Sequence, residues 1–227
     1  MKRISLISAL LCVALSAMAQ VRVTTPNTEM VLKADNGSDL KVLYYGARLS
    51  DADVAGLEAS GVAGMDAYPA YGFNCASEAC VGVTHADGNM STVLKVETVS
   101  QTQENGAQIT RVKLKDTVYP FYVTVCYKAY QDVDMIETWT EIENRGKKSV
   151  TLTRFDSGFL PIRVGNVWVS HLHGTWAAEG RLSQEPLDRG MMVIKNKDGA
   201  RNSHTDHSEV MFSLDGKPQE NSGRVIE

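Results

Sequence analysis

Two pairs of histidines are the first residues in this sequence that could do chemistry. His171 and His173 are one residue apart in a segment that predicts a β-strand, so their side chains share a face. His204 and His207 flank Asp206. Zinc needs three or four convergent ligands, which the two pairs could supply only if their segments meet in space. Histidines in ordinary hydrogen bonds are the better interpretation, and we predict no metal site.

A run of carboxylates could be compared with the acid pair of a glycosidase. It consists of Asp132, Asp134, Glu137, Glu141 and Glu143. Such a pair needs two carboxyl groups roughly 5–10 Å apart around a bound sugar. Strand alternation places the three glutamates on one exposed face, which indicates a solvated surface. The chain also has no G-x-S-x-G, phosphate-binding-loop or G-x-G-x-x-G pattern. We therefore predict no catalytic residue and no cofactor.

Trp176 is a better candidate for ligand contact. It follows a predicted strand, and Gly174 lets the backbone turn just before it. A tryptophan carried by a loop presents a flat, rigid, apolar face, on which the C–H face of a sugar can stack. A tryptophan that plugs the end of a β-sandwich would occupy the same place in the sequence. The residues alone leave both interpretations open.

Short β-prone runs separated by turn residues must position these side chains. Many short strands of this kind favour a β-sandwich or barrel, so we predict a large antiparallel all-β sandwich with few short helices. The expected helix covers residues 51–58. The expected strands cover residues 40–45, 92–98, 109–114, 121–130, 135–143, 150–153, 166–173, 191–196 and 210–214.

The composition excludes several classes of protein. The 227 residues are 43% hydrophobic and 22% charged, with a formal net charge of −4. A chain this apolar can bury a core and is not disordered. A nucleic-acid-binding protein would normally carry a basic excess, so we expect no nucleic-acid partner.

The first nineteen residues resemble a secretory signal peptide. Lys2 and Arg3 precede an apolar run, residues 4–17, and Ala17-Met18-Ala19 offers small residues for cleavage before Gln20. The run is shorter than the ~20 residues of a membrane span, so we expect none. We therefore predict a signal peptide at 1–19, one domain at 20–227, and export to the periplasm or the medium.

The sequence leaves two interpretations of the cysteines. Loss of the signal peptide removes Cys12 and leaves Cys75, Cys80 and Cys126, which cannot all pair within one chain. Cys75 and Cys80 are close enough in sequence to form a disulfide in an oxidising compartment. Free cysteines that act as small apolar residues are an equally good interpretation.

Several motifs, in order along the chain, resemble glycoside hydrolase family 36, the α-galactosidases or melibiases. The similarity is to the N-terminal β-super-sandwich domain of that family. Residues 68–72 look like E-Y-P-x-Y-G, and residues 171–179 look like H-L-P-G-x-W-x-x-E. The weaker elements are Tyr127–Tyr130, Glu143–Gly146, Pro186-Leu187 with Gly190, and Ser203-His204. One departure is Phe73-Asn74-Cys75, which stands where the family has Asp-x-Arg.

The resemblance implies a retaining hydrolase that acts on α-linked galactose. Its two catalytic aspartates lie in a (β/α)₈ barrel that follows the sandwich, and a barrel needs about 250 further residues. The family's K-W-D segment does not occur here, and residues 223–226 look like a strand with no room to finish pairing. We therefore expect the chain to stop before the barrel and to be inactive alone.

The resemblance also implies a role for Trp176 and a set of partners. The matching tryptophan of the family contacts the sugar, so Trp176 becomes the expected substrate-binding residue. The implied partners are an α-galactoside, the catalytic barrel and a homo-oligomer. A free-standing secreted module that binds carbohydrate or mediates adhesion is the alternative.

Overall fold

The computed structural model describes residues 20–72, 78–162, 165–188, 190–196, 205–221 and 225–226. Its contacts divide the chain into two compact units, Met1–Pro161 and Ile162–Glu227, which we call unit 1 and unit 2. The signal peptide predicted at 1–19 and the partner cysteine at position 75 lie outside the described residues. The single domain expected over residues 20–227 stays a prediction.

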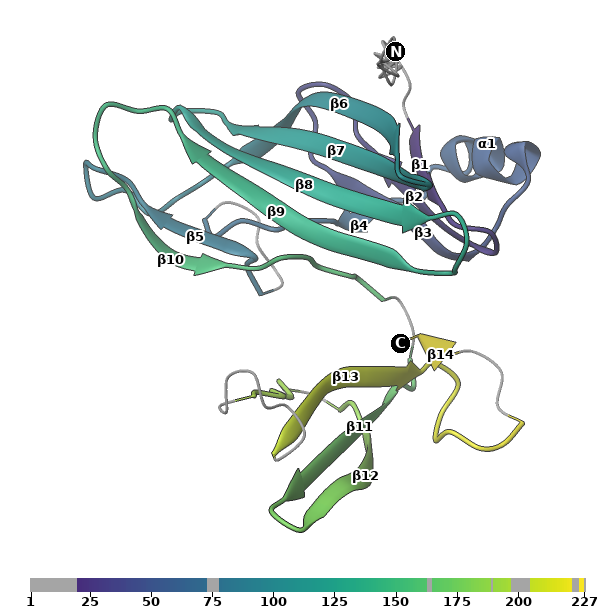
Figure 1. Cartoon of the computed structure of the whole chain (residues 1–227). Helices are drawn as coiled ribbons and strands as arrows, with labels where there is room; N and C mark the ends of the chain where they lie inside the picture. Colours follow the sequence, from purple (N-terminus) through teal and green to yellow (C-terminus); the bar gives the residue numbers. More distant parts are fainter. Residues whose placement is uncertain are drawn as a thin grey trace, which may run out of the picture. The chain divides into compact units, whose positions relative to one another are not determined.

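The regular structure described in unit 1 is antiparallel β-sheet with one short helix, which confirms the predicted all-β class (Figure 1). One sheet has the order β1-β2-β3-β4, a second has the order β6-β7-β8-β9, and β10 pairs with β5. The strands are β1 (Gln20–Thr24), β2 (Thr28–Lys33), β3 (Lys41–Ala47), β4 (Met65–Asp66), β5 (Val81–Thr84), β6 (Leu94–Glu104), β7 (Ala107–Asp116), β8 (Phe121–Tyr130), β9 (Ile136–Asn144) and β10 (Thr151–Phe155).

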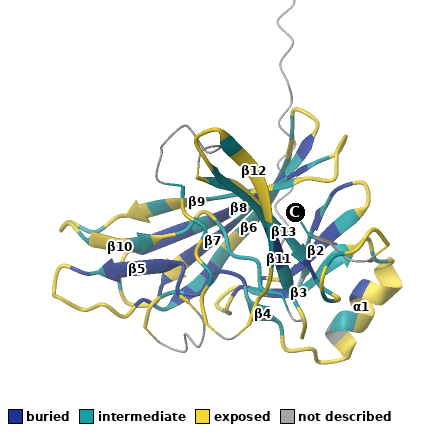
Figure 2. Ribbon diagram, turned by 90° about the horizontal axis from the view of Figure 1, so that it is seen from below, coloured by how far each residue is buried: buried dark blue, intermediate teal, exposed yellow. Residues whose placement is uncertain are grey.

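Side-chain alternation builds the core of unit 1. On β7 and β8, Val112, Leu114, Val123 and Val125 all point to one face and are at most 2% exposed. They belong to one apolar cluster with Val23 and other residues of the β1–β4 sheet, so the two sheets pack as a sandwich. Figure 2 shows this burial in dark blue along the strands. Period-two apolar patterning therefore decides which face of each strand is inside.

Local turn chemistry sets the register of the longest hairpin. β6 and β7 are joined by Asn105 and Gly106, whose φ angles are +49° and +77°. Two residues with positive φ form the tight turn that matches the twist of antiparallel strands. The pairing then runs from Glu104 opposite Ala107 to Leu94 opposite Asp116, with one bulge near Thr98.

The expected short helix is present as α1 (Asp51–Ala59). Ser50 caps its N-terminus, because the backbone N–H of Asp53 donates to Ser50 Oγ at 3.2 Å. The Asp53 carboxylate in turn accepts from the backbone N–H of Ser50 at 3.3 Å. This reciprocal capping satisfies two backbone donors at the start of the helix.

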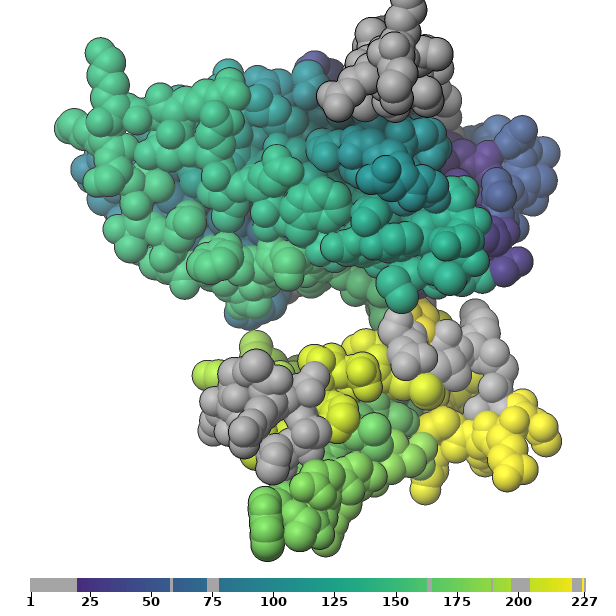
Figure 3. Space-filling view, in the orientation of Figure 1, coloured from purple at the N-terminus to yellow at the C-terminus, as the bar shows by residue number. Residues whose placement is uncertain are grey.

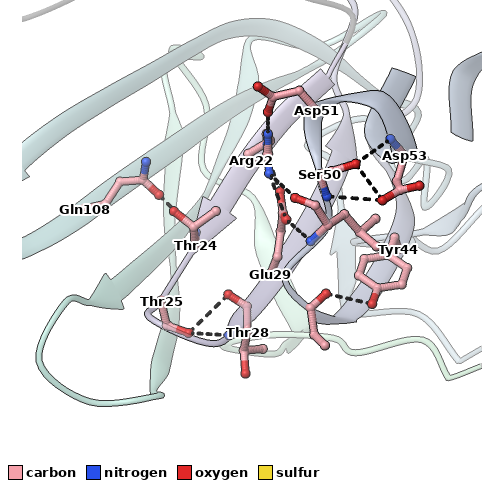
Figure 4. Close-up of polar contacts among 12 residues, drawn as sticks. Arg22, Thr24, Thr25, Thr28, Glu29, Tyr44, Ser50, Asp51, Asp53 and Gln108 are labelled. Carbon is pink, nitrogen blue, oxygen red and sulfur yellow. Dashed lines mark hydrogen bonds and ion pairs between the residues drawn. The ribbon is translucent and has the colours of Figure 1, made fainter. Parts of the chain in front are cut away.

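A buried charge ties the start of α1 to the β1–β2 hairpin (Figure 4). The Glu29 side chain is fully buried, and its carboxylate forms an ion pair with the Arg22 guanidinium. It also accepts from the backbone N–H of Leu49 at 3.0 Å, while Arg22 Nη2 donates to Leu49 O at 3.0 Å. Arg22 reaches Asp51 at 2.5 Å. The network thus joins two strands to the segment that leads into the helix.

The network lowers the pKa of Glu29. Burial alone raises the pKa of this carboxyl, but the hydrogen bonds from Arg22 and Leu49 and the charge of Arg22 outweigh burial. The folded-state pKa therefore lies below the ordinary value of 4.5. Stabilisation by the ionised carboxylate is complete above that ordinary value and is lost as pH falls through the lower folded-state value.

We predict that Arg22→Met lowers the free energy of unfolding by about 3 kcal/mol at neutral pH, because it leaves Glu29 buried without its cation. This loss of stability should become smaller below pH 4.5, where the Glu29 carboxylate, left without Arg22, takes up a proton. Urea unfolding followed by circular dichroism at both pH values measures this. Arg145→Met is the control, since Arg145 and Glu143 form an exposed pair at 2.8 Å, and it should change stability little. If Arg22→Met lowered the free energy of unfolding equally at both pH values, Glu29 would not be the buried carboxylate that Arg22 stabilises.

Unit 2 is a four-stranded sheet with the order β12-β11-β13-β14. Its strands are β11 (Trp168–Thr175), β12 (Ala178–Pro186), β13 (Asp206–Ser213) and β14 (Val225–Ile226). β11 pairs with β12 on one side and with β13 on the other, both antiparallel. The strand expected at 191–196 is wrong, because this segment has no strand pairing.

Candidate functional site

Trp176 lies at the tip of the β11–β12 hairpin and is 81% exposed. Thr175 pairs with Ala178, so only Trp176 and Ala177 form the turn. Ala177 has a φ of +58°, a conformation that costs a residue with a Cβ roughly 1–2 kcal/mol. The hairpin therefore holds the indole out from the sheet, where its face is available for contact. A plugging tryptophan would instead be buried.

Gly174 is required by the close approach of the two hairpin strands. A Cβ built at this position would lie 2.7 Å from the Glu179 Cα and 2.8 Å from the Ala178 carbonyl oxygen. Both of these are backbone atoms, which cannot move aside as a flexible side chain would. The Gly174 N–H also donates to Thr205 O at 2.7 Å, which joins the hairpin to the β13 side. This backbone geometry fixes the base of the turn that carries Trp176.

A carboxylate supports the turn from below. The backbone N–H of Ala177 donates to Glu179 Oε1 at 3.3 Å. Glu179 therefore satisfies a turn donor that would otherwise face water, as side chains often do in tight turns. The sequence from Gly174 to Glu179 thus encodes both the bend and its support.

The paired histidines lie side by side on β11, as predicted. The rings of His171 and His173 have centroids 5.8 Å apart, and His173 is opposite Asp206 on β13. His207 lies 3.7 Å from Glu209, and His204 is outside the described residues. Among the side chains that the structure describes, no three His, Cys, Asp or Glu converge as metal ligands would.

The carboxylates near β9 have structural partners. Asp134 accepts hydrogen bonds from the Thr25 hydroxyl at 2.6 Å and from the Asn27 backbone N–H at 2.8 Å. These bonds, that of Thr25 above all, lower the pKa of Asp134. Glu137, Glu141 and Glu143 are exposed on one strand face, as the alternation predicted.

The segment of residues 68–72 packs inside unit 1. Tyr68 is 5% exposed, and its hydroxyl donates to Asp156 O at 2.9 Å. Burial raises the pKa of this phenol to about 12. Gly72 has a φ of +131°, and a Cβ there would lie 2.8 Å from the Ser91 Cα. In unit 1, therefore, this motif anchors the chain through Tyr68 and Gly72, while the Tyr71 side chain is 52% exposed.

Cys80 and Cys126 are both buried in unit 1. Burial, together with the nearby Glu141 carboxylate, raises the pKa of the Cys126 thiol to about 12. A thiol of this kind stays protonated at neutral pH and is a poor nucleophile. The question of a Cys75–Cys80 disulfide rests on a residue outside the described part of the chain.

Among known protein families, the glycosyl hydrolase family 36 N-terminal domain matches this chain over residues 38–227. The chain belongs to this family. The match covers most of the sequence, from β3 through the rest of unit 1 to the hairpin that carries Trp176. No curated protein matches the chain.

Solved structures of family 36 α-galactosidases share the fold. The AgaA variant from Geobacillus stearothermophilus in complex with raffinose is 21% identical, with a TM-score of 0.75 over 85% of this chain and 31% of that chain. AgaB from the same organism is 19% identical, with a TM-score of 0.75 over 90% of this chain and 32% of that chain. The Lactobacillus brevis α-galactosidase is 20% identical, with a TM-score of 0.74 over 93% of this chain and 32% of that chain. This chain therefore spans about a third of the length of these enzymes.

We predict that Gly174→Ala destabilises unit 2 by about 1–3 kcal/mol, because the added methyl overlaps backbone atoms of the opposite strand. It should also shift the NMR signal of the Trp176 indole N–H. Gly165→Ala is the matched control, since a Cβ there meets nothing within 4 Å. Thermal unfolding and the indole spectrum are the measurements. Equal behaviour of the two variants would contradict the tight packing at Gly174.

Proposed function

We propose that this chain is the N-terminal domain of an α-galactosidase-like glycoside hydrolase, and that Trp176 forms one wall of its sugar pocket. Three findings support the proposal: the family, the fold shared with α-galactosidases, and the 81% exposure of Trp176. The exposure of Trp176 is the observation that carries it, because an exposed and rigid indole offers the flat apolar face on which a sugar ring can stack.

The role of Trp176 in this proposal is to position the substrate. The indole stacks on the C–H face of a terminal galactosyl unit and excludes water from that side. A rigid aromatic face loses little conformational entropy on binding, which makes such a residue an effective anchor. Ala177 and Gly174 fix the turn beneath it, so the indole is held in place before the sugar arrives.

The bond cleavage itself belongs to the rest of the enzyme. A retaining glycosidase uses two carboxyl groups roughly 5 Å apart, one as nucleophile and one as acid and base. The glutamates of β9 are exposed along one strand face, as on a solvated surface. The chain alone is therefore inactive on an aryl α-galactoside, and turnover requires a catalytic barrel joined to it.

We predict that Trp176→Ala lowers kcat/KM on an aryl α-galactoside by about ten- to a hundredfold, in a polypeptide that joins this domain to a family 36 barrel. This is the usual cost of losing an aromatic anchor, and the main effect should be on KM. Trp176→Phe should retain part of the activity.

Leu182→Ala is the control for that experiment. Leu182 lies on the same hairpin and is 60% exposed, but it is away from the turn. It should leave kcat/KM unchanged. Unchanged kinetics for Trp176→Ala as well, or hydrolysis by the 227-residue chain alone, would refute the proposed division of labour.

A free-standing carbohydrate-binding module is the second candidate, and the same exposed indole favours it. A binding module should bind a galactoside tightly without a barrel, and the Trp176→Ala variant should lose this binding. The proposed pocket wall predicts weak binding, because one wall supplies few contacts. Isothermal titration of the chain with raffinose separates the two.

We also propose that the protein is exported, on the charge, apolar run and cleavage pattern of residues 1–19. In the part of the chain with described structure, no helix has the length and apolar character to cross a membrane. Protein recovered from the periplasm or medium should begin at Gln20. Mass spectrometry of its N-terminal peptide tests this, and an uncleaved N-terminus in the cytoplasm would contradict it.

A further inference from the structure

A shallow groove lies on the solvent face of the β6–β9 sheet, within unit 1 and distinct from the Trp176 hairpin. Its volume is about 220 Å³. This sheet face is turned toward the viewer in Figures 1 and 3. The groove is lined by Glu104, Asn105, Ile109, Arg111, Lys128, Glu137 and Trp139.

Trp139 supplies the apolar surface of the groove. It lies on β9 opposite Cys126 of β8, which is fully buried. The indole N–H donates to Glu141 Oε1 at 3.3 Å, so the ring is held at its polar edge. Trp139 itself is half-buried, which leaves part of the ring open to solvent. A fixed, partly exposed indole on a sheet is a rigid platform for a flat apolar ligand face.

Polar side chains of both charges surround the indole. Arg111 lies 3.6 Å from Glu104, and Lys128 lies 3.6 Å from Glu137. The Tyr130 hydroxyl accepts from Lys128 Nζ at 2.9 Å and donates to Glu137 at 2.8 Å. These partners hold the charged groups in place around the ring.

The charged groups still have hydrogen-bonding capacity left for a ligand. The side chains of Glu137 and Glu104 are 51% and 36% exposed, and that of Arg111 is 34% exposed. A carboxylate accepts about four hydrogen bonds and a guanidinium donates five, more than the ion pairs use. The lining offers acceptors and donors side by side, which suits hydroxyl groups, because each hydroxyl both donates and accepts.

We propose that this groove binds one neutral pyranose ring, with its C–H face on Trp139 and its hydroxyls on Glu137, Arg111 and Asn105. Two lining carboxylates balance two lining cations, so a ligand with a net charge gains nothing and meets a like charge on either side. The volume is below the ~300–1,000 Å³ of pockets for larger ligands and suits a single ring. The proposal does not rest on the function proposed for Trp176.

The expected affinity is weak. A ring-sized ligand on an open platform binds with a Kd on the order of a millimolar. Such a site adds to the affinity for a long or branched glycan by holding a second sugar unit, since linked contacts act at a raised effective concentration.

The test is an NMR titration of the ¹⁵N-labelled 227-residue chain with methyl α-galactoside. The chain has three tryptophans, so three indole N–H signals are expected, and Trp139→Phe assigns one of them. We expect the Trp139 indole and the amides of Asn105 and Arg111 to shift and saturate. Methyl α-glucoside reports selectivity for the ring. Glycerol, which has hydroxyls but no apolar ring face, should cause no saturable shift.

Two matched variants on β9 complete the test. Glu137→Gln removes a carboxylate from the groove, and Glu143→Gln removes one from the same strand face outside it. Glu137→Gln should weaken binding at least threefold, whereas Glu143→Gln should leave it unchanged. Circular dichroism confirms that both variants fold. The proposal is overturned if no groove signal shifts, if only Trp176 responds, or if both variants weaken binding equally.

Discussion

Antiparallel strand pairing at fixed register is the constraint on which the rest of this structure depends. In unit 1 it turns the alternating residues of β7 and β8 into a core on one face and a charged, aromatic surface on the other. In unit 2 the pairing of Thr175 with Ala178 leaves only two residues for a turn and so places Trp176 at its tip. A shift of one residue in either hairpin would exchange buried and exposed faces. Both aromatic surfaces discussed above therefore follow from register.

The ion pairs described in this protein have different effects on stability when they are buried and when they are exposed. The buried Glu29 is kept ionised by Arg22 and a backbone N–H, and it joins the β1–β2 hairpin to the segment before α1. On the outer face of the β6–β9 sheet, pairs such as Lys128 with Glu137 remain partly exposed. A buried pair fixes the fold because a lone buried charge is costly. An exposed pair contributes little to stability but leaves hydrogen-bonding groups available to a ligand.

Much of the fold could be predicted from the sequence, because strands with one buried face have a clear period of two. The strands around 121–130 and 135–143, the short helix and the exposed glutamates of β9 were predicted correctly. The strand expected at 191–196 was wrong, because a β-prone composition does not guarantee a pairing partner. The exposure of Trp176 could not be predicted, because a tryptophan buried at the end of a sandwich and one exposed for sugar stacking have the same sequence pattern. The groove around Trp139 was missed, because it depends on which residues of three other strands lie beside that indole.

We propose, above all, that Trp176 contacts the sugar in an enzyme built around this domain. A crystal structure of the domain joined to a family 36 catalytic barrel, with a galactoside bound, measures this directly. We expect ring carbons of the sugar within about 4 Å of the Trp176 indole, with the two rings face to face. An indole that is buried against protein, or that points to solvent away from the occupied pocket, would contradict it.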